Sequence, residues 1–242
     1  MAHENGPTLG NGKICYVEIP AADINASATF YQNVFGWNVR IRGNGSIAFD
    51  DGINETSGSW VLGRTPSTEP GLLLSIMVDD VAETIENIKA NGCEILKHAE
   101  IGPGQFIAWF RDPGGNTIGI YQHPGGGHGK ICYIEIPADD PSKSAEFYKS
   151  IFPWHIRSDN EDNAAFDDGV EVVSGMWEPG LQPHTEVGLL IYIMMDDVAA
   201  TIKKIQAAGG KIVQPIGGDA PEITARFSDP FGNIWGLYQE PV

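Results

Sequence analysis

The sequence is poor in cysteine and in long apolar runs, and each shortage excludes a class of protein. The three cysteines, Cys15, Cys93 and Cys132, show no CxxC spacing, so neither a disulfide framework nor a zinc knuckle is encoded. We expect Cys15 and Cys132 to be small, buried, apolar side chains. No apolar run approaches the roughly 20 residues that span a bilayer, and the first residues lack the pattern of a secretory signal. A cytoplasmic protein is therefore expected.

Positive charge is also scarce. Fifteen Lys and Arg residues stand against 32 Asp and Glu residues, which gives a formal net charge of −17 at pH 7. Such a chain is repelled at long range by a phosphate backbone and by an anionic membrane surface, so we expect neither nucleic acid nor membrane as a partner. With 242 residues, 42% of them hydrophobic, the chain can bury one large core or two ordinary ones.

The strongest feature present is an internal repeat. KICYVEIP at 13–20 returns as KICYIEIP at 130–137, and matching residues in the two copies lie a constant 117 positions apart. A constant offset needs no insertion or deletion, so it indicates a duplicated domain. The further matching segments are Asp50-Asp51-Gly52 with Asp167-Asp168-Gly169, Trp60 with Trp177, Asp79-Asp80-Val81 with Asp196-Asp197-Val198, and Tyr121-Gln122 with Tyr238-Gln239.

The repeat divides the chain into four parts. Residues 1–12 are interpreted as a flexible tail, 13–122 as the first domain, and 130–242 as the second. Residues 123–129, HPGGGHG, contain glycines and a proline that neither hold a helix nor pair well in a sheet, so they are interpreted as a linker.

Each copy reads as strand, helix and three strands, twice over. The β-branched residues of 14–20 favour a strand, and Asp23 can cap a helix over 24–35, as Asp140 can in the second copy. A second strand at 72–78 precedes a helix over 80–92 that Gly92 closes. The Asp-Asp-Gly segments predict hairpin turns, since no calcium-loop series of acidic residues follows them. The fold class is therefore α+β, with four βαβββ modules.

These elements carry a family resemblance that covers nearly all of both copies. The strand, the Asp-capped helix ending in Phe-Tyr, the following Trp and the Asp-Pro-Gly-Gly-Asn hairpin resemble the vicinal oxygen chelate (VOC) superfamily of glyoxalase I, bleomycin-resistance proteins and extradiol dioxygenases. More closely, the chain looks like two-domain proteins related to lactoylglutathione lyase. The resemblance implies that four modules form two incomplete barrels. The residues that carry it are Asp23, Phe30, Tyr31, Phe35, Gly36, Trp37, Asp112, Pro113, Gly115 and Asn116, with Asp140, Phe147, Tyr148, Phe152, Trp154, Asp229, Pro230, Gly232 and Asn233.

The resemblance also implies where a divalent metal would bind, on His, Glu or Gln side chains of the concave faces. Carried over by position, those ligands fall on side chains that are poor donors, so we expect no metal and no other cofactor. The positions are Tyr16 and Tyr133 on the first strands, Leu73 and Leu190 on the strands that open the second modules, Gly119 and Gly236 after the Asn turns, and, with an uncertain register, the vicinity of Gly58 and Gly175.

Alternation along the first strand puts Cys15, Val17 and Ile19 on one face and Tyr16 and Glu18 on the other, which we expect to be concave. A carboxylate there could act as a base, and the phenol could donate to a developing oxyanion. The candidate catalytic residues are Glu18, Glu135, Tyr16 and Tyr133. The alternative is a structural carboxylate that pairs with Arg or Lys or reaches solvent.

The candidate ligand-binding residues are Trp60, Trp177, Leu73, Leu190, Ser75, Tyr192, Met77 and Met194. Aromatic and polarisable side chains suit a flat organic ligand, although for the tryptophans and methionines an ordinary barrel core is an equal alternative. The copies differ at Ser75 against Tyr192 and at Trp109 against Arg226, so two clefts would not bind the same molecule equally well.

The sequence thus predicts a metal-independent protein of this superfamily that binds a small organic molecule, as a monomer or a homodimer. An alternative is a lyase or isomerase acting on a carbonyl substrate, with a Glu base and a Tyr oxyanion donor. A less favoured alternative is a metal-dependent lactoylglutathione lyase or extradiol dioxygenase with displaced ligands.

Overall fold

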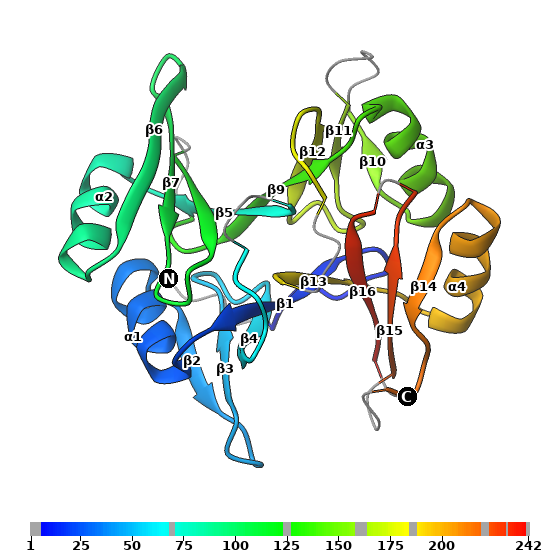
Figure 1. Ribbon diagram of the computed structural model, residues 1–242, viewed down its shortest axis with the longest axis horizontal. Coiled ribbons are helices and arrows are strands. Elements are labelled where there is room, and N and C mark those ends of the chain that lie inside the picture. The colour runs from blue at the N-terminus through cyan, green and yellow to red at the C-terminus, as the bar shows by residue number, and fades with distance from the viewer. Residues whose placement is uncertain are drawn as a thin grey trace. The chain divides into compact units, whose positions relative to one another are not determined.

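The computed structural model describes residues 6–67, 71–122, 127–157, 164–183, 188–218, 223–230 and 232–240. The chain forms two compact units (Figure 1). Unit 1 contains Met1–Pro7, Val17–Glu69 and Leu73–Tyr133, and unit 2 contains Thr8–Tyr16, Pro70–Leu72 and Ile134–Val242. Among the described residues, no helix has the length and apolar content needed to cross a membrane.

The first copy contains ten elements in the predicted order of strand, helix and three strands, repeated once. They are β1 (Ile14–Ala21), α1 (Ile24–Phe35), β2 (Asn38–Ile41), β3 (Ile47–Asp50), β4 (Ser57–Leu62), β5 (Leu73–Val78), α2 (Val81–Ala90), β6 (Glu94–Gly102), β7 (Gln105–Arg111) and β8 (Thr117–Gln122).

The second copy repeats this order with shorter strands. Its elements are β9 (Ile131–Pro137), α3 (Pro141–Ile151), β10 (His155–Ile156), β11 (Ala165–Asp167), β12 (Ser174–Glu178), β13 (Leu190–Met194), α4 (Val198–Ala207), β14 (Lys211–Gln214), β15 (Ile223–Ser228) and β16 (Ile234–Gln239). The α+β class and the four βαβββ modules are therefore confirmed.

Helix ends follow the predicted capping chemistry. The Asp23 carboxylate accepts hydrogen bonds from the N–H groups of Asn25 and Ala26, and Asp140 accepts one from Lys143 N, so each satisfies backbone donors that have no partner within the helix. After α2, Gly92 has a φ of +81°, the left-handed conformation that glycine adopts without strain.

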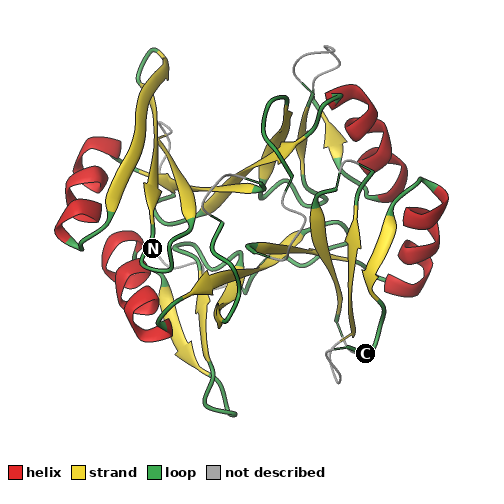
Figure 2. Ribbon diagram, viewed as in Figure 1, coloured by secondary structure: helices red, strands yellow, loops and turns green. Residues whose placement is uncertain are grey.

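Within each unit the helices pack against one face of the strands (Figure 2). In unit 1 the hydrogen-bonded strand orders are β1-β4-β3-β2 and β9-β5-β8-β7-β6, and in unit 2 they are β9-β12-β11-β10 and β1-β13-β16-β15-β14. β1 and β9 appear twice because each strand is divided between the units. Each order begins and ends on a different strand, so the strands do not close into a ring.

The first strand of each copy begins in the unit built mainly from the other copy. Gly129 N donates to Met77 O at 2.8 Å and Met77 N donates to Lys130 O at 2.7 Å in unit 1, and Gly12, Lys13 and Met194 repeat the pattern in unit 2. Gly12 and Gly129 each have a φ of +81°, and a Cβ on Gly129 would lie 2.1 Å from the carbonyl oxygen of Phe35. Residues from Thr8 onward, expected to form part of a tail, therefore belong to unit 2.

The residues that carry the family resemblance build two matching aromatic cores. In unit 1 the Trp37 ring stacks on Tyr31 at 4.5 Å and on Phe49 at 4.3 Å. The buried Tyr31 hydroxyl donates to Asp112 at 2.9 Å, and Asn116 Nδ2 donates to Pro20 O at 2.6 Å. These bonds tie α1 and β1 to the hairpin between β7 and β8. Tyr148, Asp229 and Asn233 repeat the arrangement in unit 2.

Candidate functional site

The face of each sheet that the helices leave uncovered carries the side chains singled out in the first strands. Val17 and Ile19 are fully buried, whereas Tyr16 and Glu18 on the opposite face of β1 are half-buried. β9 repeats this alternation, with Ile134 buried and Tyr133 and Glu135 half-buried. Because the chain passes between units within these strands, Tyr16 belongs to unit 2 and Glu18 to unit 1, while Tyr133 belongs to unit 1 and Glu135 to unit 2.

Glu18 is paired with an arginine that sequence reasoning did not identify. Arg64, in the loop after β4, donates through Nη2 to Glu18 Oε2, and the two side chains are 15% and 19% exposed. The other terminal guanidinium nitrogen, Nη1, is buried and has no hydrogen-bond partner among the described residues. The only signal for this pair was the asymmetry of the repeat, because the position that matches Arg64 in the second copy is Leu181.

In unit 2, a tyrosine ring occupies the middle of the uncovered face. Tyr192 on β13 is 4% exposed and lies edge-on to Tyr16, with ring centres 5.9 Å apart. Its hydroxyl accepts a hydrogen bond of 3.5 Å from Arg226 Nη2 on β15. The ring covers Gly236 so closely that a Cβ on this glycine would lie 2.2 Å from Tyr192 Cδ1.

In unit 1, the matching positions hold different side chains. Ser75 on β5 stands where Tyr192 stands in unit 2, and a Cβ on Gly119 would lie 2.2 Å from Ser75 Oγ. Trp109 replaces Arg226, and Lys97 Nζ on β6 lies 4.2 Å from the centre of the Trp109 ring, a cation–π contact. Ser75 is 8% exposed, whereas Trp109 is half-buried.

The remaining candidate ligand-binding residues divide into two groups. Leu73 and Leu190 are fully buried, Met194 is 9% exposed and Met77 is half-buried, and all four share a strand face with Ser75 or Tyr192. Trp60 and Trp177 instead lie in the aromatic cores, with ring centres 4.8 Å from Phe49 and 5.0 Å from Phe166, respectively. The tryptophans thus take the core position that was the alternative interpretation.

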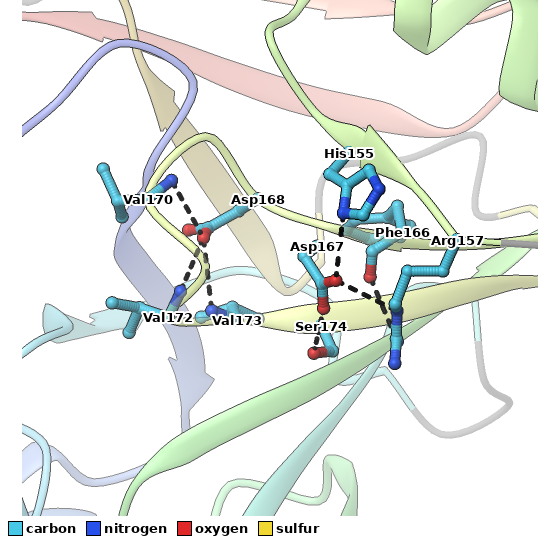
Figure 3. A network of polar contacts seen from close by, with 9 residues as sticks. All are labelled: His155, Arg157, Phe166, Asp167, Asp168, Val170, Val172, Val173 and Ser174. Atoms are coloured by element: carbon cyan, nitrogen blue, oxygen red, sulfur yellow. Dashed lines mark hydrogen bonds and ion pairs between the residues drawn. The ribbon is translucent and has the colours of Figure 1, made fainter.

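The acidic doublets form polar networks as well as the predicted turns. Asp167 accepts hydrogen bonds from Ser174 Oγ at 2.6 Å and contacts Arg157 Nε at 3.1 Å (Figure 3). In the first copy, Asp50 is bound by Arg40 and Ser57. Burial raises the pKa of Asp50, but hydrogen bonds from Arg40 and Ser57 outweigh it and hold that pKa below its usual range.

The second aspartate of each doublet binds the start of the first strand of the other copy, a role that sequence reasoning missed. Asp51 Oδ2 accepts a hydrogen bond of 3.0 Å from Ile131 N in unit 1, and Asp168 Oδ2 accepts one of 2.8 Å from Ile14 N in unit 2. The same two carboxylates accept hydrogen bonds from backbone N–H groups of their own turns, as Figure 3 shows for Asp168. The only available signal was the recurrence of the doublets at the constant offset.

Two of the three cysteines, Cys15 and Cys132, do not have the chemistry of nucleophiles. The Cys15 thiol donates to Tyr192 O and the Cys132 thiol to Ser75 O, at 3.6 and 3.5 Å. Burial raises the pKa of both thiols to about 12, which keeps them protonated near neutral pH.

The donor set does not fit the metal that the resemblance implies. The carried-over positions hold tyrosine, leucine and glycine, and the described part of the chain contains no group of three or more His, Cys, Asp or Glu side chains able to hold a metal ion. At Gly119 and Gly236, two of the carried-over positions, glycine offers no side chain to a metal, and in unit 2 the Tyr192 ring lies 2.2 Å from where a Cβ on Gly236 would be.

Comparison with known proteins defines the class. The sequence model of the Glyoxalase/Bleomycin resistance protein/Dioxygenase superfamily matches residues 13–120 and 130–237, so the chain belongs to this superfamily. It is 26% identical over 247 residues to "Putative glyoxylase CFP32" of Mycobacterium tuberculosis, covering 92% of both chains. It is 27% identical over 177 residues, 65% of this chain and 49% of the other, to "Probable lactoylglutathione lyase, chloroplastic" of Arabidopsis thaliana.

A solved structure supports the same fold. Glyoxalase I from Zea mays superposes with a TM-score of 0.74 at 19% sequence identity, covering 94% of this chain and 92% of that chain. At this identity the likeness concerns the fold alone. The match to the family model confirms the recognition of the superfamily from the sequence.

Proposed function

We propose that this chain binds a small organic molecule on the uncovered faces of its sheets without using a metal. The observation that carries the proposal is the residue set at the carried-over ligand positions, where Gly119 and Gly236 offer no side chain to a metal and the Tyr192 ring covers Gly236. The tyrosine and leucine at the other carried-over positions support it further, because neither neutral phenol nor alkyl groups are good ligands for a divalent ion.

The surroundings suit an organic ligand. Tyr133, Met77 and Trp109 are half-buried around the buried Ser75 on the face of unit 1. Aromatic and thioether groups provide apolar, polarisable contact area, and a few polar groups fix the orientation of a ligand. This composition supports binding of a flat molecule rather than of a metal-chelated substrate.

Two measurements test the proposal. Elemental analysis of protein purified without chelator should find substoichiometric divalent metal, and a thermal-shift screen of small aromatic and carbonyl compounds should find stabilising ligands whose effect persists in EDTA. A stoichiometric metal, or lactoylglutathione lyase activity that requires an added divalent ion, would refute the metal-free proposal.

The carboxylates provide the test of the enzymatic alternative, a lyase or isomerase with a Glu base. In unit 1 Glu18 is already engaged by Arg64, and the second copy has Leu181 at the sequence position that matches Arg64. Any turnover found in the screen should therefore be compared between wild type, Glu18→Gln, Glu135→Gln and the double variant that carries both substitutions. Turnover that survives in the double variant would remove both carboxylates from the reaction while leaving binding intact.

A further inference from the structure

The two units differ at one seat on the uncovered face, and the difference suggests which unit binds the ligand. The seat is the space above the glycine of the last strand, Gly119 in unit 1 and Gly236 in unit 2. The following inference rests on the proposed function. We propose that the side chain of Tyr192 itself fills the seat in unit 2. Unit 1, with Ser75 at this place, binds a planar molecule that carries a phenolic or enolic oxygen.

The strands around the two seats are aligned in the same way. Ser75 pairs with Gly119 on parallel strands, as Tyr192 pairs with Gly236. Gly119 is also opposite Trp109, as Gly236 is opposite Arg226. The thiol of Cys132 on β9 donates to the backbone carbonyl of Ser75 in unit 1. The thiol of Cys15 on β1 donates to that of Tyr192 in unit 2. The side chains can therefore be compared position by position.

In unit 2 the seat already holds a phenol. The Tyr192 ring lies over Gly236, edge-on to Tyr16, and its hydroxyl is bonded by Arg226. With 4% of Tyr192 exposed, the occupant is buried. These contacts are the ones that a protein offers to a bound phenol: an open backbone beneath the ring, an aromatic edge beside it and a cationic donor at the oxygen.

In unit 1 the residue at the seat is smaller by a whole ring. Ser75 supplies only a hydroxyl above Gly119 and is itself 8% exposed, while Tyr133, Met77 and Trp109 in the same unit are half-buried. A buried residue such as Ser75 among partly exposed aromatic and thioether groups is the arrangement expected when a ring-sized molecule completes the packing.

The surrounding charges favour an oxygen-bearing ring over a hydrocarbon. Lys97 Nζ lies over the ring of Trp109, the residue that holds the position of Arg226 in unit 1 opposite Gly119. The Ser75 hydroxyl can donate or accept a further hydrogen bond. A phenol or enol oxygen, which carries partial or full negative charge, matches this combination.

The test uses 4-methylphenol, which is the side chain of tyrosine as a free molecule. Calorimetric titration of the full chain should give one binding site in wild type. Ser75→Tyr, which copies unit 2 into unit 1, should weaken binding by at least about tenfold. Tyr192→Ser, which copies unit 1 into unit 2, should add a second site. Ser75→Ala is the matched control, because it keeps the space open and should retain one site.

The Tyr192→Ser arm protects the test against misfolding, since a gained site cannot result from a damaged protein. Two sites in wild type, unchanged binding in Ser75→Tyr, or no binding of 4-methylphenol to wild type and to Tyr192→Ser would each overturn the proposal. If other organic ligands still bind in EDTA and neither substitution affects them, the proposed function survives and this inference alone fails. Discovery of a stoichiometric metal would instead overturn the proposed function and this inference with it.

Discussion

The carboxylate of Asp168 accepts a 2.8 Å hydrogen bond from the backbone N–H of Ile14, which lies 154 residues earlier in the chain. Asp51 and Ile131 form the same contact in unit 1 at 3.0 Å. The second aspartate of each doublet thus fixes the start of a strand that the other copy contributes. Without that carboxylate, a buried N–H would lose its acceptor.

Replacing this carboxylate should destabilise the fold. Asp168→Ala leaves Ile14 N and three N–H groups of its own turn without the acceptor, so we expect a loss of about 2–4 kcal/mol in the free energy of unfolding, above the 1–3 kcal/mol of a single unsatisfied buried group. Urea unfolding measures it. The exposed Asp139→Ala is the matched control, with an expected change below about 0.5 kcal/mol. Equal stability of the two variants would contradict the anchoring role.

The Glu18–Arg64 pair should behave as an interacting pair in unfolding experiments. In a double-mutant cycle with Glu18→Gln and Arg64→Leu, we expect a coupling of about 1 kcal/mol in unfolding free energy, because both side chains are largely buried. Arg64→Leu introduces the residue that the second copy carries at position 181. A cycle between Arg64→Leu and Glu135→Gln is the control and should show additive effects; coupling there, or additivity in the first cycle, would refute the pairing.

The seat glycines should differ in their tolerance of a methyl group. Gly236→Ala places a Cβ against the Tyr192 ring, which is buried and has little freedom to move, so we expect a loss of about 1–3 kcal/mol. Gly119→Ala meets the Ser75 hydroxyl, which can rotate away, and otherwise Ser75 Cβ at 3.2 Å and Leu74 O at 3.5 Å, so it should cost less. Thermal and urea unfolding compare the variants. Tyr192→Ser should rescue Gly236→Ala, and failure of the rescue would mean that the ring is not what excludes the side chain.

The buried Asp112 should make stability fall as pH rises. Burial raises the pKa of Asp112 above its usual range, although hydrogen bonds from Asn116 and Tyr31 oppose the shift. The folded protein therefore keeps this proton at pH values where the unfolded chain has lost it. Stability declines from the ordinary aspartate pKa, about 3.9, up to the raised value. The unfolding free energy of wild type minus that of Asp112→Asn should decrease across this window; a difference that rises with pH would contradict the assignment.

Much of the fold was predictable because its signals are local. The caps at Asp23 and Asp140, the left-handed Gly92 and the alternation of Val17 with Glu18 depend on residues a few positions apart, and the structure has all of them. The tryptophans Trp60 and Trp177 were less certain, because an aromatic residue in a strand suits either a cleft wall or a core. Their rings lie in the cores, against Phe49 and Phe166.

By itself the sequence determined the duplication, the order of strands and helices, the superfamily and the poor donors at the carried-over ligand positions. Only the tertiary structure decided that residues 13–16 pair in the unit of the second copy, that Arg64 holds Glu18, and that Tyr192 covers Gly236. The alternation of apolar residues and the capping residues depend only on positions that are close together in the chain. Which distant strand a segment joins, and which side chain fills the space above a glycine, depends on packing between segments up to 185 residues apart, which no local pattern encodes.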